Sequence, residues 1–313
     1  METVRITKAH TGQRDEQVLA QLGLPPATYY RWEGRAVQGS LVDQIVLPTH
    51  TGLLPTPLEE SAVCHYAQAH PRTGYKRLTW QMVDENVAFL RQNQVYAVLE
   101  RNDLLARRGT LPAAALHRPP EAQRPDERWH VDIMYLRVEV RWCYLVDILD
   151  AYSRYLVHWT LNLTMLADTI TQTVQEALDH TQALRQAQPE VVHDNGKQFI
   201  SSEWRQLVAG TAIKDIATRV AHPQSNGRLE RLHRSHREEG LADADLSSYY
   251  AAQDALKRWD HFYNHERPHT ALHYLHPVDY YRGDPAVRLQ ERVAKLERGK
   301  QLRDAYWREQ RKP

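Results

Sequence analysis

The chain lacks the features of secreted, disulfide-stabilised and membrane proteins. Its 313 residues include two cysteines, Cys64 and Cys143, which form neither a CxxC pair nor a disulfide framework. No apolar run reaches the roughly eighteen residues of a membrane-spanning helix, and the N-terminus has no apolar signal-peptide core. We therefore expect a cytoplasmic protein in a reducing compartment, without a structural zinc site.

The chain also lacks a charge imbalance. Its 40 Lys and Arg residues nearly balance 39 Asp and Glu, so the net charge of +1 gives no global argument for a nucleic-acid partner. Basic charge is concentrated locally, since residues 288–313 contain nine Lys or Arg and four Asp or Glu. A hydrophobic content of 42% suits a soluble protein with a real core, and the length suits about two domains.

Three acidic residues are candidate ligands of a divalent metal ion. Asp132 lies within WHVDIMYLRV, which alternates like a half-buried strand, where a carboxylate is costly unless a cation or donors satisfy it. Asp194 follows a short apolar run and precedes an Asn-Gly turn, and Glu230 comes after thirty-five intervening residues on a polar, helical segment. Taken singly, Asp194 would be an ordinary turn residue and Glu230 a solvated helix position.

Sequence blocks around these acids change that interpretation. They are WHVD at 129–132, YLVDILDAYSR at 144–154, DNGKQF at 194–199, HPQSNGRLE at 222–230 and YNHERPHTAL at 263–272. A basic residue, Arg237, stands seven positions after Glu230. Together the blocks resemble the catalytic core of insertion-sequence transposases and retroviral-type integrases, and most closely the second reading-frame product of two-frame insertion sequences. That class has an Asp, Asp, Glu triad whose last two acids are about thirty-five residues apart.

The resemblance implies the roles of the three acids. Asp132, Asp194 and Glu230 would be both the catalytic residues and the ligands of two Mg²⁺ or Mn²⁺ ions, with Asp132 shared between them. Asp147 and Asp150 also follow an apolar strand and are rival first carboxylates. We favour Asp132 because of the preceding tryptophan, and we interpret Asp150 as part of a structural turn.

Pattern and resemblance together predict the fold class. Two strands joined through residues 139–141 and a third strand at 155–163 are followed by helix, strand, helix, strand and helix. This is the ribonuclease H-like order, an α/β core with a mixed five-stranded sheet and flanking helices. Small all-helical domains of helix-turn-helix type precede it.

The predicted domains follow changes in composition. Residues 1–47 form a helix-turn-helix-like segment and 58–108 a second helical, DNA-binding-like domain. A linker at 109–127 contains four prolines. The catalytic core covers 128–283, and a basic C-terminal helix covers 284–313. An ordinary helical hairpin for the first segment, and a loosely held, solvated helix for the last, remain alternatives.

Several residues are candidates for contact with DNA. Candidates in the first segment would face a groove of the DNA. Basic candidates elsewhere would contact DNA phosphates, or would simply form a solvated basic face. The candidates are Thr28, Arg31, Lys76, Arg77, Asn226, Arg231 and Arg237.

The predicted function is that of a DNA transposase. It would bind the ends of a mobile element and catalyse strand cleavage and strand transfer. Its partners would be double-stranded DNA, further copies of the chain in a synaptic complex and, as an open alternative, a first-reading-frame DNA-binding protein. A domesticated DNA-binding protein without catalysis and a hydrolytic nuclease of the same fold are the alternative functions.

Overall fold

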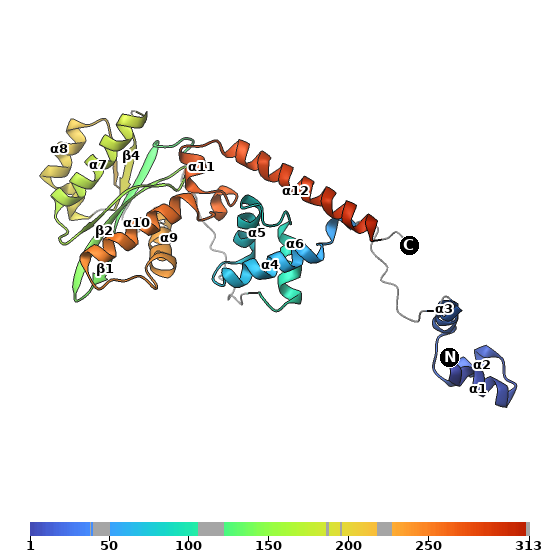
Figure 1. Ribbon diagram of the computed structural model, residues 1–313. Coiled ribbons are helices and arrows are strands. Elements are labelled where there is room, and N and C mark those ends of the chain that lie inside the picture. The colour runs from blue at the N-terminus through green and yellow to red at the C-terminus, as the bar shows by residue number, and fades with distance from the viewer. Residues whose placement is uncertain are drawn as a thin grey trace. The chain divides into compact units, whose positions relative to one another are not determined.

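A computed structural model describes residues 1–37, 39, 51–105, 122–185, 188–194, 196–217 and 227–310 (Figure 1). The chain divides into two compact units, Met1–Thr51 and Gly52–Pro313. No helix in these ranges has the length and apolarity to cross a membrane.

The first unit is built from three short helices: α1 Glu2–Thr11, α2 Asp15–Gln21 and α3 Pro26–Val37. Val18, Leu19 and Tyr29 are buried in its small apolar centre. Gly23, with a φ of +66°, lies in the turn between α2 and α3, where a side chain would strain the backbone. The two helices and their turn confirm the predicted pattern. Leu22, just beyond the end of α2, is 40% exposed.

The second unit begins with three helices around their own core. They are α4 Pro57–Ala69, α5 Tyr75–Asp84 and α6 Gln92–Arg101, preceded by the 3₁₀ turn η1 Thr51–Leu53. Helix α4 starts with a capping box, in which the backbone N–H groups of Thr56 and Glu59 donate to each other's side chains at 2.9 and 3.2 Å. Val63, Leu78 and Met82 are among the fully buried residues that hold the helices together.

A five-stranded sheet follows in the same unit. Its strands are β1 Arg128–Val138, β2 Arg141–Asp150, β3 Leu156–Asn162, β4 Glu190–His193 and β5 Lys214–Ala217. Their order in space is β3-β2-β1-β4-β5; β1, β2 and β3 pair antiparallel, while β4 pairs parallel to β1 and β5 parallel to β4. This mixed sheet has the ribonuclease H-like topology that the sequence predicts.

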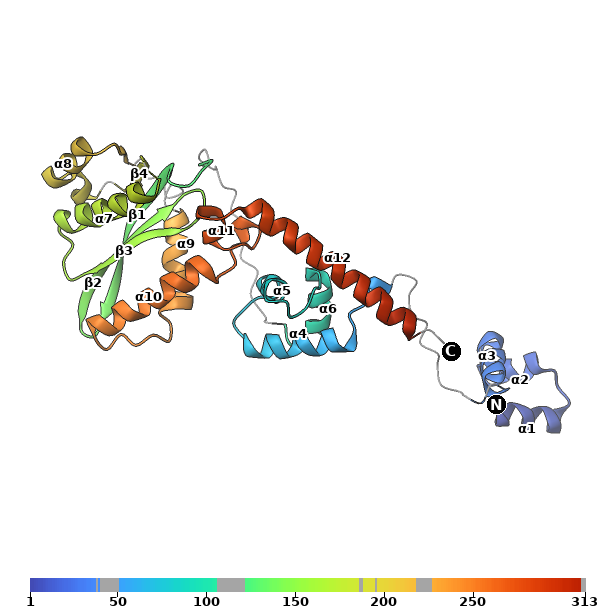
Figure 2. The same cartoon turned by 45° about the horizontal axis from the view of Figure 1, so that its top comes forward.

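Helices cover both faces of the sheet (Figures 1 and 2). Because strand residues alternate in direction, Trp129 and Val131 pack on one face against α7 Ala167–Arg185 and α8 Ser202–Gly210, with the 3₁₀ turn η2 Lys197–Ile200 beside them. Met134 and Leu136 pack on the other face. That face carries α9 Gly227–Ser235, the π turn η4 His236–Gly240 and α10 Tyr249–His265. Asp132 belongs to this second face.

The chain ends in η5 Thr270–Leu272, α11 Pro277–Tyr281 and the 25-residue helix α12 Pro285–Glu309. Helix α12 runs along the α4–α6 helices (Figure 1). Arg292 donates to the Asp84 carboxylate at 2.9 and 2.6 Å, and Arg303 donates to the Glu59 carboxylate at 2.8 Å. A side chain at Gly299 would come within 2.5 Å of Phe89, so the helix is packed closely here.

These contacts correct the alternative of a loosely held, solvated C-terminal helix. Arg303 is 3% exposed and also donates to the carbonyl oxygens of Gly52 and Phe89, so its charge is used inside the protein rather than on DNA phosphates. The helix is therefore not a loosely held, solvated terminus. Arg298 and Lys300 stay on its exposed side.

We predict that Arg303→Gln lowers the free energy of unfolding by about 3 kcal/mol, because it leaves the Glu59 carboxylate without its buried partner. Urea unfolding followed by tryptophan fluorescence measures this. Arg298→Gln is the matched control and should change stability by less than about 0.5 kcal/mol. Equal stability of the two variants would show that the Arg303 contacts do not hold α12 in place.

Candidate active site

Asp132 is a half-buried carboxylate in the middle of β1. One of its oxygens, Oδ1, accepts a hydrogen bond of 2.9 Å from the backbone N–H of Ile133, and Oδ2 lies 3.9 Å from Nδ1 of His233. Burial raises the pKa of Asp132, and the charges of Asp194 and Asp147 raise it further, whereas His233 and the Ile133 N–H lower it. A raised pKa means that the negative charge is incompletely compensated by the protein.

The parallel pairing of β1 with β4 brings Asp194 close to Asp132. Register pairs His130 with Val192, so Asp132 lies two residues further along β1 and Asp194 two residues after Val192, directly beyond the end of β4. Asp194 Oδ1 accepts a hydrogen bond of 2.9 Å from the N–H of Gly196, which fixes the turn after β4. The strand end is held by His193, whose Nε2 lies 2.6 Å from Asp215 Oδ1.

Glu230 occupies the first turn of α9, which packs against β1. Leu229 and Leu232 are buried, while Glu230 is exposed. Glu230 borders a hollow of 390 Å³ together with His233, Arg234, Arg237 and Glu238. Within the described ranges, no three His, Cys, Asp or Glu side chains are close enough to share a metal ion.

The structure thus brings Asp132 and Asp194 together and leaves Glu230 on the open side of α9. Carboxylate oxygens are the ligands that Mg²⁺ and Mn²⁺ prefer. Two neighbouring carboxylates, one of which has a raised pKa, fit a divalent cation, although the third ligand is not gathered with them.

Asp147 is a buried acid whose partners the sequence analysis missed. It lies directly opposite Asp132 in the β1–β2 pair, is 0% exposed, and its Oδ2 contacts Nε2 of His233 at 3.2 Å and Nε2 of His236 at 3.3 Å. Burial would raise the pKa of Asp147, but the two imidazoles outweigh burial and lower it below its ordinary value. The signal was available, since both histidines share the helical spacing of Leu229 and Leu232.

The two rival first carboxylates differ from Asp132 in their contacts. Asp147 is enclosed by imidazoles and has no surface for a metal ion. Asp150 is buried and accepts hydrogen bonds from the N–H groups of Asp126 and Ser153 and from the Ser153 hydroxyl. Burial raises the pKa of Asp150 to about 6 despite these donors. Its interpretation as a structural turn is confirmed.

The candidate DNA-contacting residues lie in different places. Arg31 is exposed on α3, where Thr28 is half-buried beside the buried Tyr29. Arg231 and Arg237 are exposed on α9 and the π turn, and Arg237 Nε donates to the carbonyl oxygen of His233 at 3.2 Å. Asn226 lies outside the described residues.

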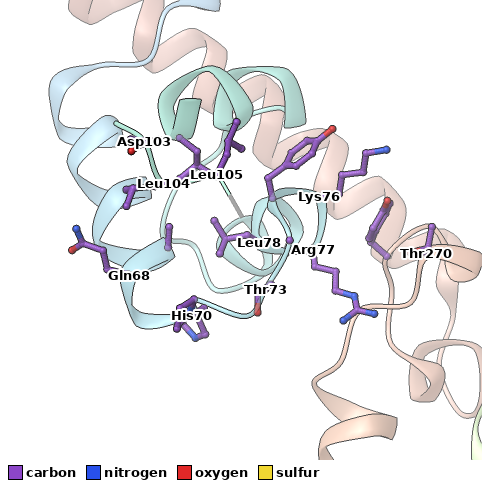
Figure 3. A pocket seen from close by; sticks show the side chains of 16 residues that line it. Gln68, His70, Thr73, Lys76, Arg77, Leu78, Asp103, Leu104, Leu105 and Thr270 are labelled. Carbon is purple, nitrogen blue, oxygen red and sulfur yellow. The ribbon is translucent and has the colours of Figure 1, made fainter. Parts of the chain in front are cut away.

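Lys76 and Arg77 lie in the first turn of α5 and border a hollow of 810 Å³, which Thr270 of η5 also lines. Figure 3 shows both side chains on the side of the hollow nearer Thr270, with Leu104 on the opposite side. Lys76 is exposed, whereas Arg77 forms an ion pair of 3.4 Å with Glu239. Arg77 is thus engaged within the protein.

Glu239 joins three parts of the second unit. It lies in the π turn after α9, contacts Arg77 of α5, and accepts two hydrogen bonds of 2.7 Å from Arg267 in the segment after α10. Arg267 also donates to the hydroxyl of Ser235 at 3.1 Å. Burial would raise the pKa of Glu239, but the hydrogen bonds from Arg267 and the charges of Arg267 and Arg77 lower it.

We predict that Glu239→Gln lowers the free energy of unfolding at pH 7 by about 1–2 kcal/mol, because charge-assisted hydrogen bonds are lost. The pKa of Glu239 is lower in the folded than in the unfolded protein, where it is about 4.3. The stabilisation by its charge is therefore complete above about pH 4.3 and is lost as the pH falls through the folded-state pKa. The difference in free energy of unfolding between wild type and variant should accordingly narrow below about pH 4.3. Urea unfolding at several pH values measures this difference, with the exposed Glu238→Gln as the control. A difference that does not change with pH would contradict the prediction.

Comparison with known proteins matches the core of the second unit. Two profiles described as "Integrase core domain" match residues 122–223 and 211–277. The transposase for insertion sequence element IS904 of Lactococcus lactis is 26% identical over 51% of this chain and 63% of its own length. An uncharacterised 39.2 kDa protein of insertion element IS476 from Xanthomonas euvesicatoria is 21% identical over 72% and 66%, respectively. The chain therefore spans slightly under two thirds of these two relatives.

One of the solved structures that match is a chain in the structure of a simian T-cell lymphotropic virus intasome in complex with PP2A regulatory subunit B56 gamma. The match has 16% sequence identity and a TM-score of 0.45, and it covers 71% of this chain and 74% of that chain. The profile matches and the insertion-element relatives place the chain, through its residues 122–277, in the integrase-core superfamily of insertion-sequence transposases.

Proposed function

We propose that the chain is a DNA transposase that binds the ends of a mobile element and catalyses strand cleavage and strand transfer there. The observation that carries the proposal is the proximity of Asp132 and Asp194, which the β1–β4 pairing produces inside an integrase core. Glu230, on the helix that packs against β1, would be the third member of the triad.

The three carboxylates would hold two Mg²⁺ or Mn²⁺ ions. Bound divalent cations activate the attacking oxygen and stabilise the leaving oxygen of a phosphodiester. The chain's own contribution is to hold hard oxygen ligands on a rigid sheet, with Asp132 fixed on β1 and Asp194 by its turn. Arg231 and Arg237 lie exposed near Glu230, where their charges would contact the DNA phosphates. This chemistry needs no covalent intermediate on the protein.

DNA recognition would be divided between the two units. In the first unit, α3 follows α2 across a short turn, and Thr28 and Arg31 would face base edges in the major groove. In the second unit, Lys76 would contact phosphates. Further copies of the chain would complete the synaptic complex, and a first-reading-frame product would supply additional DNA binding.

We predict that Asp132→Asn, Asp194→Asn and Glu230→Gln each abolish strand cleavage in Mg²⁺ while DNA binding and thermal stability are retained, because each removes one anionic ligand. Cleavage and joining of labelled donor DNA measure this, with Glu203→Gln as a control on α8. Cleavage by any triad variant at the wild-type rate would remove that residue from the triad. Cleavage without joining in the wild-type protein would favour a hydrolytic nuclease.

A second prediction separates base recognition from phosphate contact. Arg31→Ala should reduce the preference for the element end over random duplex by about 1–3 kcal/mol, because base contacts carry sequence information. Lys76→Gln should weaken binding to the element end and to random duplex equally, and should lower the slope of log affinity against log salt by about 0.9. Fluorescence anisotropy across a salt series measures both. An unchanged preference in Arg31→Ala would contradict the role of α3.

A further inference from the structure

The buried face of α9 contains polar side chains where apolar ones would suffice for packing. Leu229, Leu232 and His233 lie on this face, and His236 follows in the first position of the π turn; the two histidines have exposed fractions of 6% and 1%. Both histidines contact Asp147, which is fully buried in β2. Replacing such a buried charged cluster by apolar residues is often neutral or stabilising. Anchoring of α9 alone therefore does not explain why the cluster is polar.

His233 differs from His236 because it lies between two carboxylates. Its Nε2 is 3.2 Å from Asp147 Oδ2, and its Nδ1 is 3.9 Å from Asp132 Oδ2. Asp132 and Asp147 are directly opposite each other in the antiparallel β1–β2 pair, where like charges repel. His236 contacts Asp147 alone of these two acids. The two sides of the His233 ring thus have separate partners.

We infer that His233 is a positioning residue that holds the Asp132 carboxylate in the orientation needed to bind a divalent cation. The Ile133 N–H donates to Oδ1 of Asp132, and Nδ1 of the His233 ring restrains Oδ2. Asp147 contacts the opposite nitrogen of the ring, Nε2, and so fixes the ring's position. Residues that contact a metal ligand without touching the metal orient that ligand, and the loss of such a residue typically lowers metal affinity about 10- to 100-fold. This inference rests on the proposed function, because it needs Asp132 to be a metal ligand.

Two amide substitutions separate the two contacts of His233. In His233→Asn the amide stands where Nδ1 was and keeps a donor near Asp132, whereas in His233→Gln the amide reaches toward Asp147 and leaves Asp132 without its neighbour. We expect His233→Gln to raise the Mn²⁺ concentration for half-saturation by about tenfold or more, and His233→Asn by less than about threefold. Electron paramagnetic resonance of free Mn²⁺ measures binding directly, without DNA or turnover.

His236→Asn is the matched control, because it removes the other contact to Asp147 and leaves Asp132 untouched. It should lower the thermal unfolding temperature and leave Mn²⁺ binding unchanged. If His233→Asn and His233→Gln bind Mn²⁺ equally well, or if His233→Asn is the weaker of the two, His233 serves only to anchor α9 and the inference is wrong.

Should His233→Gln fail to fold, the comparison is made in the Asp147→Asn background, where an amide pair replaces the buried charge. His233→Gln should still weaken Mn²⁺ binding about tenfold relative to Asp147→Asn alone. Loss of Mn²⁺ binding in Asp132→Asn tests the proposed function separately. Wild-type-like binding by Asp132→Asn would refute the metal-ligand assignment and this inference together, whereas weak binding by Asp132→Asn with normal binding by His233→Gln would refute the inference alone.

Discussion

The arrangement of the core depends on electrostatic compensation among three carboxylates at one level of the sheet. The β1–β2 register places Asp147 opposite Asp132, and the β1–β4 pairing brings Asp194 to the other side of Asp132. Like charges at this spacing destabilise a sheet unless cations intervene. The protein supplies imidazoles for Asp147 and leaves the charge of Asp132, beside Asp194, incompletely compensated. That residual negative charge is what a divalent cation would satisfy.

A second set of charged contacts ties the helices before the core to the helix after it. Arg292 and Arg303 of α12 are buried against Asp84 and Glu59, and Trp307 donates to the carbonyl oxygen of Leu54. Arginine suits such an interface because its planar guanidinium donates to a carboxylate and to backbone carbonyls at once. Basic residues near a chain end are thus weak indicators of DNA binding until their partners are known.

Local pattern was sufficient for the elements and the class of fold. Alternation within WHVDIMYLRV predicted β1, and the helix-turn-helix-like segment predicted at 1–47 contains the α2–α3 pair. The order of strands and helices, together with the family resemblance, predicted the mixed five-stranded sheet that β1 to β5 form. The elements themselves depend on neighbours along the chain, so spacing and residue type determine them.

Partners across the fold were decided by tertiary structure alone. The sequence by itself singled out Asp132 from its strand context, whereas Asp194 and Glu230 were singled out by the flanking blocks and spacing that carry the family resemblance. It did not show that Asp147 would be enclosed by His233 and His236, or that Arg303 would be buried. Each of those outcomes joins residues about 90 to 240 positions apart. Only packing determines whether a charged side chain contacts a compensating partner, solvent or a like charge.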